Sequence, residues 1–87
     1  MAIYVAERTL PGITHEQLAA MQHAAIEMCA RFTAQGRSVR YLRSIFVLSE
    51  ARCMSLFEAE DGALVRDVNE AAQLPFTRII EAVELTP

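Results

Sequence analysis

The spacing of apolar and polar residues along the chain predicts six elements in the order strand, helix, strand, strand, helix, strand. Short runs of β-branched, aromatic and other apolar residues bounded by turn residues indicate strands, whereas apolar residues three and four positions apart indicate helices. The predicted strands cover residues 2–9, 39–48, 52–58 and 77–85, and the predicted helices lie between residues 14 and 36 and between residues 61 and 74.

Both predicted helices have recognisable ends. Thr14 followed three residues later by Gln17 is the pattern of a capping box, and Asp61 is a suitable N-cap for the second helix. Gly36 suits the end of the first helix. Pro75 disfavours helical geometry in the residue before it, and it therefore predicts the end of the second helix.

This order of elements predicts a ferredoxin-like βαββαβ sandwich, an α+β fold in which two helices cover one face of a four-stranded antiparallel sheet. We expect residues 1–87 to form one such domain. Apolar residues make up 53% of the chain, and the strand at 39–48 is apolar on both of its faces. Because two helices cover only one side of the sheet, we expect a homodimer in which a second copy covers the other.

Composition and charge exclude several classes of partner. The net charge is −3 and the eight basic residues are scattered, which does not favour binding to nucleic acid or to an anionic membrane surface. No apolar run approaches the roughly 18 residues that span a bilayer, and the first residues do not resemble a cleavable signal, so we expect a cytoplasmic protein. Cys29 and Cys53 lack the spacing of a metal site and are expected to be buried thiols.

Four polar residues occupy positions where the pattern expects apolar ones. Gln22 lies within the apolar stripe of the first helix, and Asn69 lies within that of the second. Glu7 shares the parity of the apolar residues of the first strand, and Arg43 shares that of an apolar series in the second. If these parities face the helices, the four side chains meet in one layer.

One interpretation of such a cluster is structural. Glu7 and Arg43 would form a buried or half-buried ion pair, and Gln22 and Asn69 would donate hydrogen bonds to it or to ordered water. In a second structural interpretation, the four side chains simply reach water at the ends of their elements.

The favoured functional interpretation is a binding pocket for a small anion or polar metabolite. Arg43 would hold a carboxylate or similar anion in a forked pair, and Gln22 and Asn69 would orient it. Tyr41 and Cys53 would line the same pocket.

A small cofactor-free oxygenase or isomerase is a further alternative, with a substrate bound by Arg43 and Glu7 acting as the base. The chain has no glycine-rich phosphate loop, no H-E-x-x-H and no G-x-S-x-G. The absence of a catalytic motif therefore favours a binding protein.

A metal site on the first helix is the remaining alternative. His23 and Glu27 are one turn apart, with Glu16 on nearly the same face, and imidazole and carboxylate groups ligate divalent metals. Pairs with this spacing are also common on exposed helix surfaces.

The segments YVAERTLPGITHEQL, VRYLRSIFV, RCMSLFEAED and VNEAAQLPFTRIIEAVEL resemble those of a bacterial family of small domains of unknown function labelled nickel-binding-protein-like. The resemblance covers nearly the whole chain and implies a ferredoxin-like homodimer, with nickel bound in some members. It implies that histidines of those members fall near Glu7, Gln22 or His23, Arg43 and Asn69. A guanidinium cannot ligate nickel and repels it, so this chain departs from that pattern.

Overall fold

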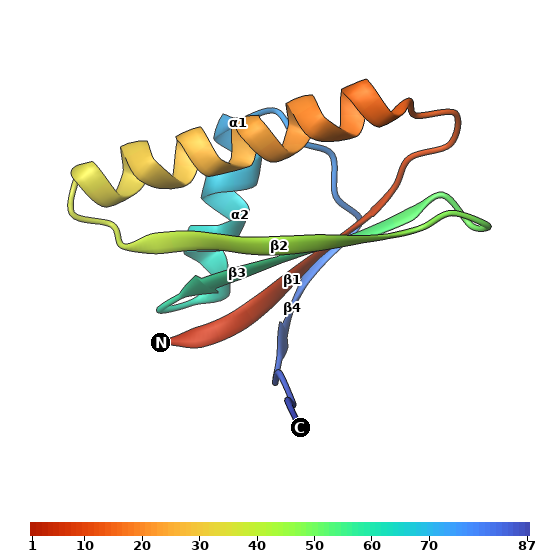
Figure 1. Ribbon diagram of the computed structural model, residues 1–87. Coiled ribbons are helices and arrows are strands. Elements are labelled where there is room, and N and C mark those ends of the chain that lie inside the picture. The colour runs from red at the N-terminus through yellow and green to blue at the C-terminus, as the bar shows by residue number, and fades with distance from the viewer.

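The computed structural model describes residues 1–87 and contains the six elements in the predicted order (Figure 1). The strands are β1 (Ala2–Thr9), β2 (Val39–Val47), β3 (Arg52–Ala59) and β4 (Arg78–Ala82), and the helices are α1 (His15–Ala34) and α2 (Gly62–Ala71). All neighbouring strands pair antiparallel in the order β2-β3-β1-β4. This arrangement is the ferredoxin-like α+β fold, and the predicted fold class is confirmed.

The predicted helix starts are present as hydrogen bonds. Thr14 Oγ1 accepts from the Gln17 amide at 3.1 Å, and Gln17 Oε1 accepts from the Thr14 amide at 2.9 Å, which completes the capping box. Asp61 Oδ1 accepts from the Leu64 amide at 2.9 Å at the start of α2. Gly36 follows α1 with a φ of +89°, a left-handed conformation that glycine adopts without strain.

Two elements end earlier than the sequence predicts. Helix α2 stops at Ala71, because Gln73 adopts a left-handed φ of 57° and the Leu74 amide donates back to the Asn69 carbonyl at 2.9 Å. The chain therefore turns before Pro75 rather than at it. Strand β4 covers Arg78–Ala82 only, so the segment after residue 82 leaves the sheet.

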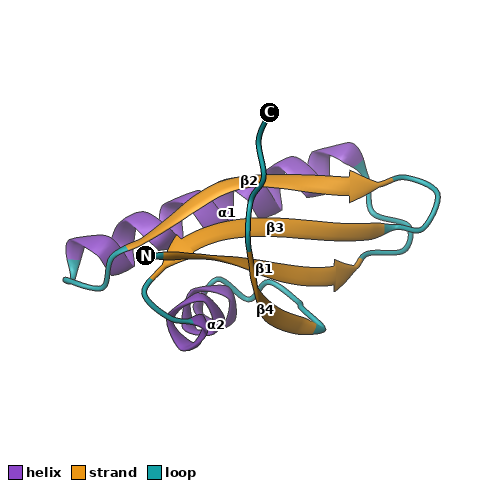
Figure 2. Cartoon of the chain, turned by 90° about the horizontal axis from the view of Figure 1, so that it is seen from below, coloured by secondary structure: helices purple, strands orange, loops and turns teal.

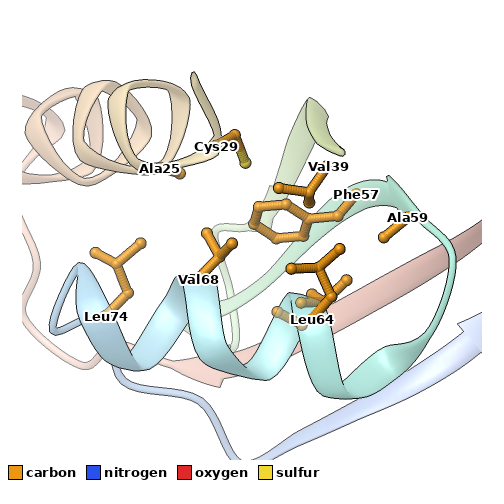
Figure 3. Packing of buried hydrophobic residues seen from close by; sticks show 10 residues of the cluster. Ala25, Cys29, Val39, Phe57, Ala59, Leu64, Val68 and Leu74 are labelled. Carbon is orange, nitrogen blue, oxygen red and sulfur yellow. The ribbon is translucent and has the colours of Figure 1, made fainter. Parts of the chain in front are cut away.

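The two helices pack on one face of the sheet and enclose the core with it (Figure 1). In Figure 3, Ala25 and Cys29 of α1 and Val68 of α2 point into the same layer as Phe57 of β3. Phe57 is fully buried at the centre of this layer, and burying a side chain of this size stabilises the fold by about 1.5–3 kcal/mol. No helix is both long and apolar enough to cross a membrane.

The helices differ in length, and the difference leaves one end of the sheet covered by α1 alone. Helix α1 has 20 residues and α2 has 10, which at about 1.5 Å per residue correspond to about 30 Å and about 15 Å. Figures 1 and 2 show α2 near the N-terminal end of β1, whereas the N-terminal half of α1 lies toward the β2–β3 turn. At that end, residues of α1 and of the sheet line a cavity.

Strand β2 contains a bulge that reverses the expected parity of its second half. Tyr41 pairs with Phe57 and Arg43 pairs with Leu56, so Leu42 has no partner in the register. The residues of β2 whose side chains face the helices are therefore odd-numbered before the bulge and even-numbered after it. The expectation that Tyr41 and Arg43 share one face of the strand is wrong. Helix-facing residues of β2 are Val39, Tyr41, Ser44 and Phe46.

The face of the sheet opposite the helices carries no element, but the last residues of the chain extend along it. Glu84 forms an ion pair with Arg43 of β2, although it follows β4 at the other edge of the sheet. The segment 83–87 therefore crosses the open side, as Figure 2 shows from below. Val83 and Leu85 in this segment are 82% and 89% exposed.

Candidate functional site

The four polar residues predicted to converge do not meet. Glu7 and Arg43 lie on the open face of the sheet, and Gln22 and Asn69 lie on the helix side. The prediction failed in β1 because Glu7 shares its face of the strand with Ile3 and Val5, and this face points away from the helices. It failed in β2 because the bulge turns Arg43 away from the helices. Of the four, only Gln22 lines the cavity between α1 and the sheet.

Glu7 and Arg43 each have a partner of their own. Glu7 Oε1 accepts a hydrogen bond from Arg78 Nε at 2.5 Å, and this bond is the main reason that the pKa of Glu7 is lower than usual. Arg43 pairs with Glu84 and its side chain is 53% exposed. The predicted Glu7–Arg43 ion pair is therefore absent. Neither residue lines the cavity between α1 and the sheet, so the structure does not support an enzyme in which this pair binds and deprotonates a substrate there.

Asn69 is fully buried, as its position in the apolar stripe of α2 predicts, but it points into the core. Its Nδ2 donates to the Val65 carbonyl at 2.8 Å within the same helix. Its Oδ1 is the one buried side-chain oxygen or nitrogen without a hydrogen-bond partner. Asn69 does not line the cavity described next.

A partly enclosed cavity lies between the N-terminal half of α1 and the helix-facing side of β1, β2 and β3. It has a volume of about 220 Å³. Of the residues predicted from the sequence, Gln22, Tyr41 and Cys53 line it, and Gln22 is exposed where the cavity opens to solvent.

Arg8 is the residue of this cavity that the prediction missed. Its side chain comes from β1 on the parity opposite to Glu7 and is only 3% exposed. Arg8 Nε donates to Ser55 Oγ at 3.3 Å, and Nη1 donates to the Pro75 carbonyl at 3.0 Å. A guanidinium has five N–H groups, so three have no oxygen acceptor within the protein.

A short chain of hydroxyl groups extends from Arg8 across the cavity floor. Ser55 Oγ lies 2.8 Å from Ser44 Oγ, and Ser44 Oγ lies 2.8 Å from Tyr41 Oη. The Cys53 thiol lies 3.8 Å from Ser55 Oγ at the side of this chain. Two hydrogen bonds join these three hydroxyl groups, and each bond uses one hydroxyl proton. One of the three protons therefore takes no part in these two bonds.

The positive charge of Arg8 has no counter-charge in the cavity. None of the twelve lining residues is acidic, and Arg8 forms no salt bridge. Burial lowers the pKa of Arg8, and the nearby Cys53 and Tyr41 partly offset this effect. Arginine stays protonated even when its pKa falls below the usual range. The site is therefore a fixed, largely dehydrated cation with unused donors, which suits a carboxylate or another oxyanion.

The predicted metal ligands form a pair on the helix surface. His23 Nε2 lies 3.0 Å from Glu27 Oε1, and both side chains are more than half exposed. No group of three or more histidine, cysteine, aspartate and glutamate side chains is close enough to hold a metal ion. Glu16 therefore does not complete a site with this pair.

A sequence signal for Arg8 existed, but it needed the strand register to be interpreted. Arg8 shares its parity with Tyr4 and Ala6 and pairs with Cys53 of β3. Strand β3 alternates between Cys53, Ser55 and Phe57 on one face and Met54 and Leu56 on the other. Small polar residues next to an arginine on the core side indicate a polar site.

Comparisons with known proteins agree with the fold. A family described as nickel responsive protein SCO4226-like matches residues 4–82. The crystal structure of SCO4226 from Streptomyces coelicolor A3(2) is similar with a TM-score of 0.78 and 21% sequence identity, over 99% of this chain and 100% of that chain. At this identity the likeness shows the fold alone. No curated protein sequence matches the chain.

Proposed function

The chain belongs to the family of nickel responsive SCO4226-like proteins, and we propose that it is a binding domain that holds a small anion on Arg8 beneath α1. The observation that carries this proposal is a 3% exposed guanidinium with no acidic residue beside it in the cavity and three N–H groups that have no oxygen acceptor. Burying an unpaired charge costs several kcal/mol. An anion bound beside Arg8 would offset that cost and would use the free donors.

The start of α1 adds to the positive potential of the cavity. His15 and Leu18, both in the first turn of the helix, line the cavity. The N-terminal end of a helix carries a partial positive charge that favours anions, and the effect acts mainly within the first turn. The helix and Arg8 therefore favour the same sign of ligand.

A nuclear magnetic resonance titration tests the proposal with acetate and inorganic phosphate as probes at constant ionic strength. The Nε–H signal of Arg8 should shift with one or both anions, because the bound charge lies next to the same guanidinium. The shift should saturate, because the cavity offers a single site. The matched control is Arg40, whose side chain is 69% exposed and pairs with Glu58. Equal, unsaturated shifts of both arginine signals, or no shift at all, would contradict anion binding at Arg8.

The family description raises the question of nickel, and the donor groups of this chain do not fit that ion. Nickel is bound by imidazole, thiolate and carboxylate groups. His23 and Glu27 supply two such groups on an exposed surface, and no third lies near enough. Arg8 occupies the cavity between helix and sheet and cannot be a ligand. We therefore assign nickel no role at either place.

Isothermal titration with nickel chloride tests this disagreement. The wild-type protein should show no saturable heat at micromolar concentrations, and His23→Ala should behave identically. Tight binding by the wild type that is lost in His23→Ala would make nickel binding the better proposal.

The open face of the sheet supports the expected homodimer. Apolar side chains from all four strands face away from the helices, by the alternation of the registers; they include Ile3, Val5, Ile45, Leu56 and Ile80. Ile45 is 54% exposed, and the crossing segment adds the exposed Val83 and Leu85. Exposed apolar residues gathered on one face of a sheet in this way are typical of an interface.

Charge also favours a second copy as the occupant of this face. Glu7 pairs with Arg78, Arg43 with Glu84 and Arg40 with Glu58, so these charged residues on this side are neutralised within the chain. Two copies can then approach face to face without repulsion between like charges. Interfaces related by a two-fold axis bring the same patch from each subunit together.

Analytical ultracentrifugation of two aspartate variants tests the dimer. Ile45→Asp should convert a wild-type dimer into a monomer, because it places a charge in the interface. The control is Ile26→Asp on α1, where the isoleucine is 47% exposed on the helix side, and it should remain a dimer. A wild-type protein that is monomeric at tens of micromolar would contradict the proposed homodimer.

A further inference from the structure

The cavity under α1 has two chemically different sides, and this difference bears on the kind of anion that it would hold. Arg8, Ser44, Ser55 and Tyr41 form its sheet side, where the hydrogen-bonding groups are concentrated. The helix side is mainly apolar: Leu18, Ala19, Met21 and Ala25 line it, together with the exposed, polar His15 and Gln22. A ligand in this space therefore meets hydrogen-bond donors on the sheet side and mostly hydrocarbon on the helix side.

A purely polar anion would leave the helix side without a partner. Leu18 and Met21 are only partly buried in the protein, and both face the cavity. Covering apolar surface stabilises a complex by about 25 cal/mol for each Å² removed from water. Phosphate, sulfate or acetate would gain little from these side chains, whereas an anion with an apolar body would gain from both sides.

The volume of the cavity limits the size of that body. A cavity of about 150 Å³ lined by aliphatic and aromatic residues holds a benzene molecule, and the present cavity measures about 220 Å³. The additional space is enough for a carboxylate beside one ring. Sites for drug-sized molecules begin at about 300 Å³, so a ligand enclosed by this cavity is smaller than those molecules.

From this geometry we propose that the ligand is a small monocarboxylate with one ring or a branched aliphatic group, of about the size of benzoate. Its carboxylate accepts from the free N–H groups of Arg8 and from the spare proton of the hydroxyl chain. Its apolar body lies against Leu18 and Met21. This inference rests on the anion-binding function proposed above and specifies its ligand class.

Four probes of graded chemistry test the ligand class by isothermal titration with the full-length protein. Benzoate and cyclohexanecarboxylate have both the charge and the apolar body, acetate has the charge alone, and benzamide has the ring without the charge. Benzoate or cyclohexanecarboxylate should bind at least tenfold more tightly than acetate and than benzamide. Arg8→Met should weaken benzoate by at least tenfold and change benzamide by less than threefold.

A second variant separates the apolar side from the charge. Met21→Gln keeps the length of the side chain and makes the helix side polar, so it should weaken benzoate at least threefold and leave acetate unchanged. Ile26→Gln, on the same helix but outside the cavity, should change neither probe.

The outcomes distinguish the two proposals. Equal affinities of acetate and benzoate would contradict the proposed apolar part of the ligand and would leave the proposed anion site in place. Benzamide binding as tightly as benzoate would overturn anion recognition by Arg8, and with it both proposals. Failure of all four probes, together with an unchanged Arg8 signal in the phosphate and acetate titration, would also overturn both.

Discussion

Replacing Arg8 with methionine should stabilise the protein when no anion is present. The guanidinium is 3% exposed, and only two neutral oxygens, Ser55 Oγ and the Pro75 carbonyl, accept its hydrogen bonds. Taking an ion out of water costs several kcal/mol, and no carboxylate balances that cost here. Methionine keeps much of the apolar length of the side chain without the charge.

The partners of Arg8 do not lose all their hydrogen bonds in this variant, which fixes the sign of the effect. Ser55 Oγ keeps its 2.8 Å contact with Ser44 Oγ. Pro75 is exposed, so its carbonyl can accept from water. Replacing buried ions by apolar residues of similar volume is often neutral or stabilising by about 1–4 kcal/mol. We therefore expect Arg8→Met to raise the free energy of unfolding by about 1–3 kcal/mol.

Urea unfolding measures this effect in a buffer without carboxylate, phosphate or sulfate, with Arg40→Met as the control. Arg40 forms an exposed pair with Glu58, so its replacement should change the stability by less than about 1 kcal/mol. A benzoate concentration near 100 times its Kd should then stabilise the wild type by about 2.7 kcal/mol and leave Arg8→Met unchanged. A loss of about 3 kcal/mol or more in Arg8→Met would show that Arg8 stabilises the fold, and the reasoning would be refuted.

Three further predictions concern other parts of the molecule. Thr14→Ala removes the capping box of α1 and should lower the free energy of unfolding by about 0.5–2 kcal/mol in urea; an unchanged midpoint would contradict the role of the cap. Iodoacetamide at pH 8 should modify Cys53, which lines the cavity, before Cys29, whose pKa burial raises to about 11; mass spectrometry of the peptides would show the reverse order if this packing were wrong. The hydrogen bond from Arg78 lowers the pKa of Glu7 below its ordinary 4.5, so its contribution to stability is present above pH 4.5 and is lost as the pH falls through the lower value; a carboxyl titration at or above 4.5 would disprove the pair.

Local signals in the sequence predicted the elements well, because they act over a few residues. The capping box at Thr14 and Gln17 and the N-cap at Asp61 each require only neighbouring groups, and both are formed. The order of strands and helices then follows from their succession along the chain. Asn69 was correctly placed in the buried stripe of α2, since helical periodicity alone decides that position.

The candidate site was harder to predict because it depends on contacts between distant segments. Strand β2 is apolar on both parities, so nothing in its sequence marks Leu42 as the residue of the bulge that turns Arg43 outward. The orientation of Arg8 follows from the pairing of β1 with β3, which the sequence does not specify. Gln22 lies in the apolar stripe of α1, but it is exposed because the cavity separates that part of the helix from the sheet.

The positive charge of Arg8 makes the cavity more favourable for an anion than for a cation. At an effective dielectric constant of about 20, two unit charges about 5 Å apart interact by about 3 kcal/mol, so a divalent cation beside the guanidinium is repelled by about 6–7 kcal/mol. A difference of this size corresponds to a factor of about 10⁴–10⁵ in affinity. Two or three good metal ligands would be needed to overcome it, and the lining of the cavity supplies only His15 and Cys53. A single buried arginine in β1 therefore makes this cavity of the ferredoxin-like scaffold unfavourable for a metal ion.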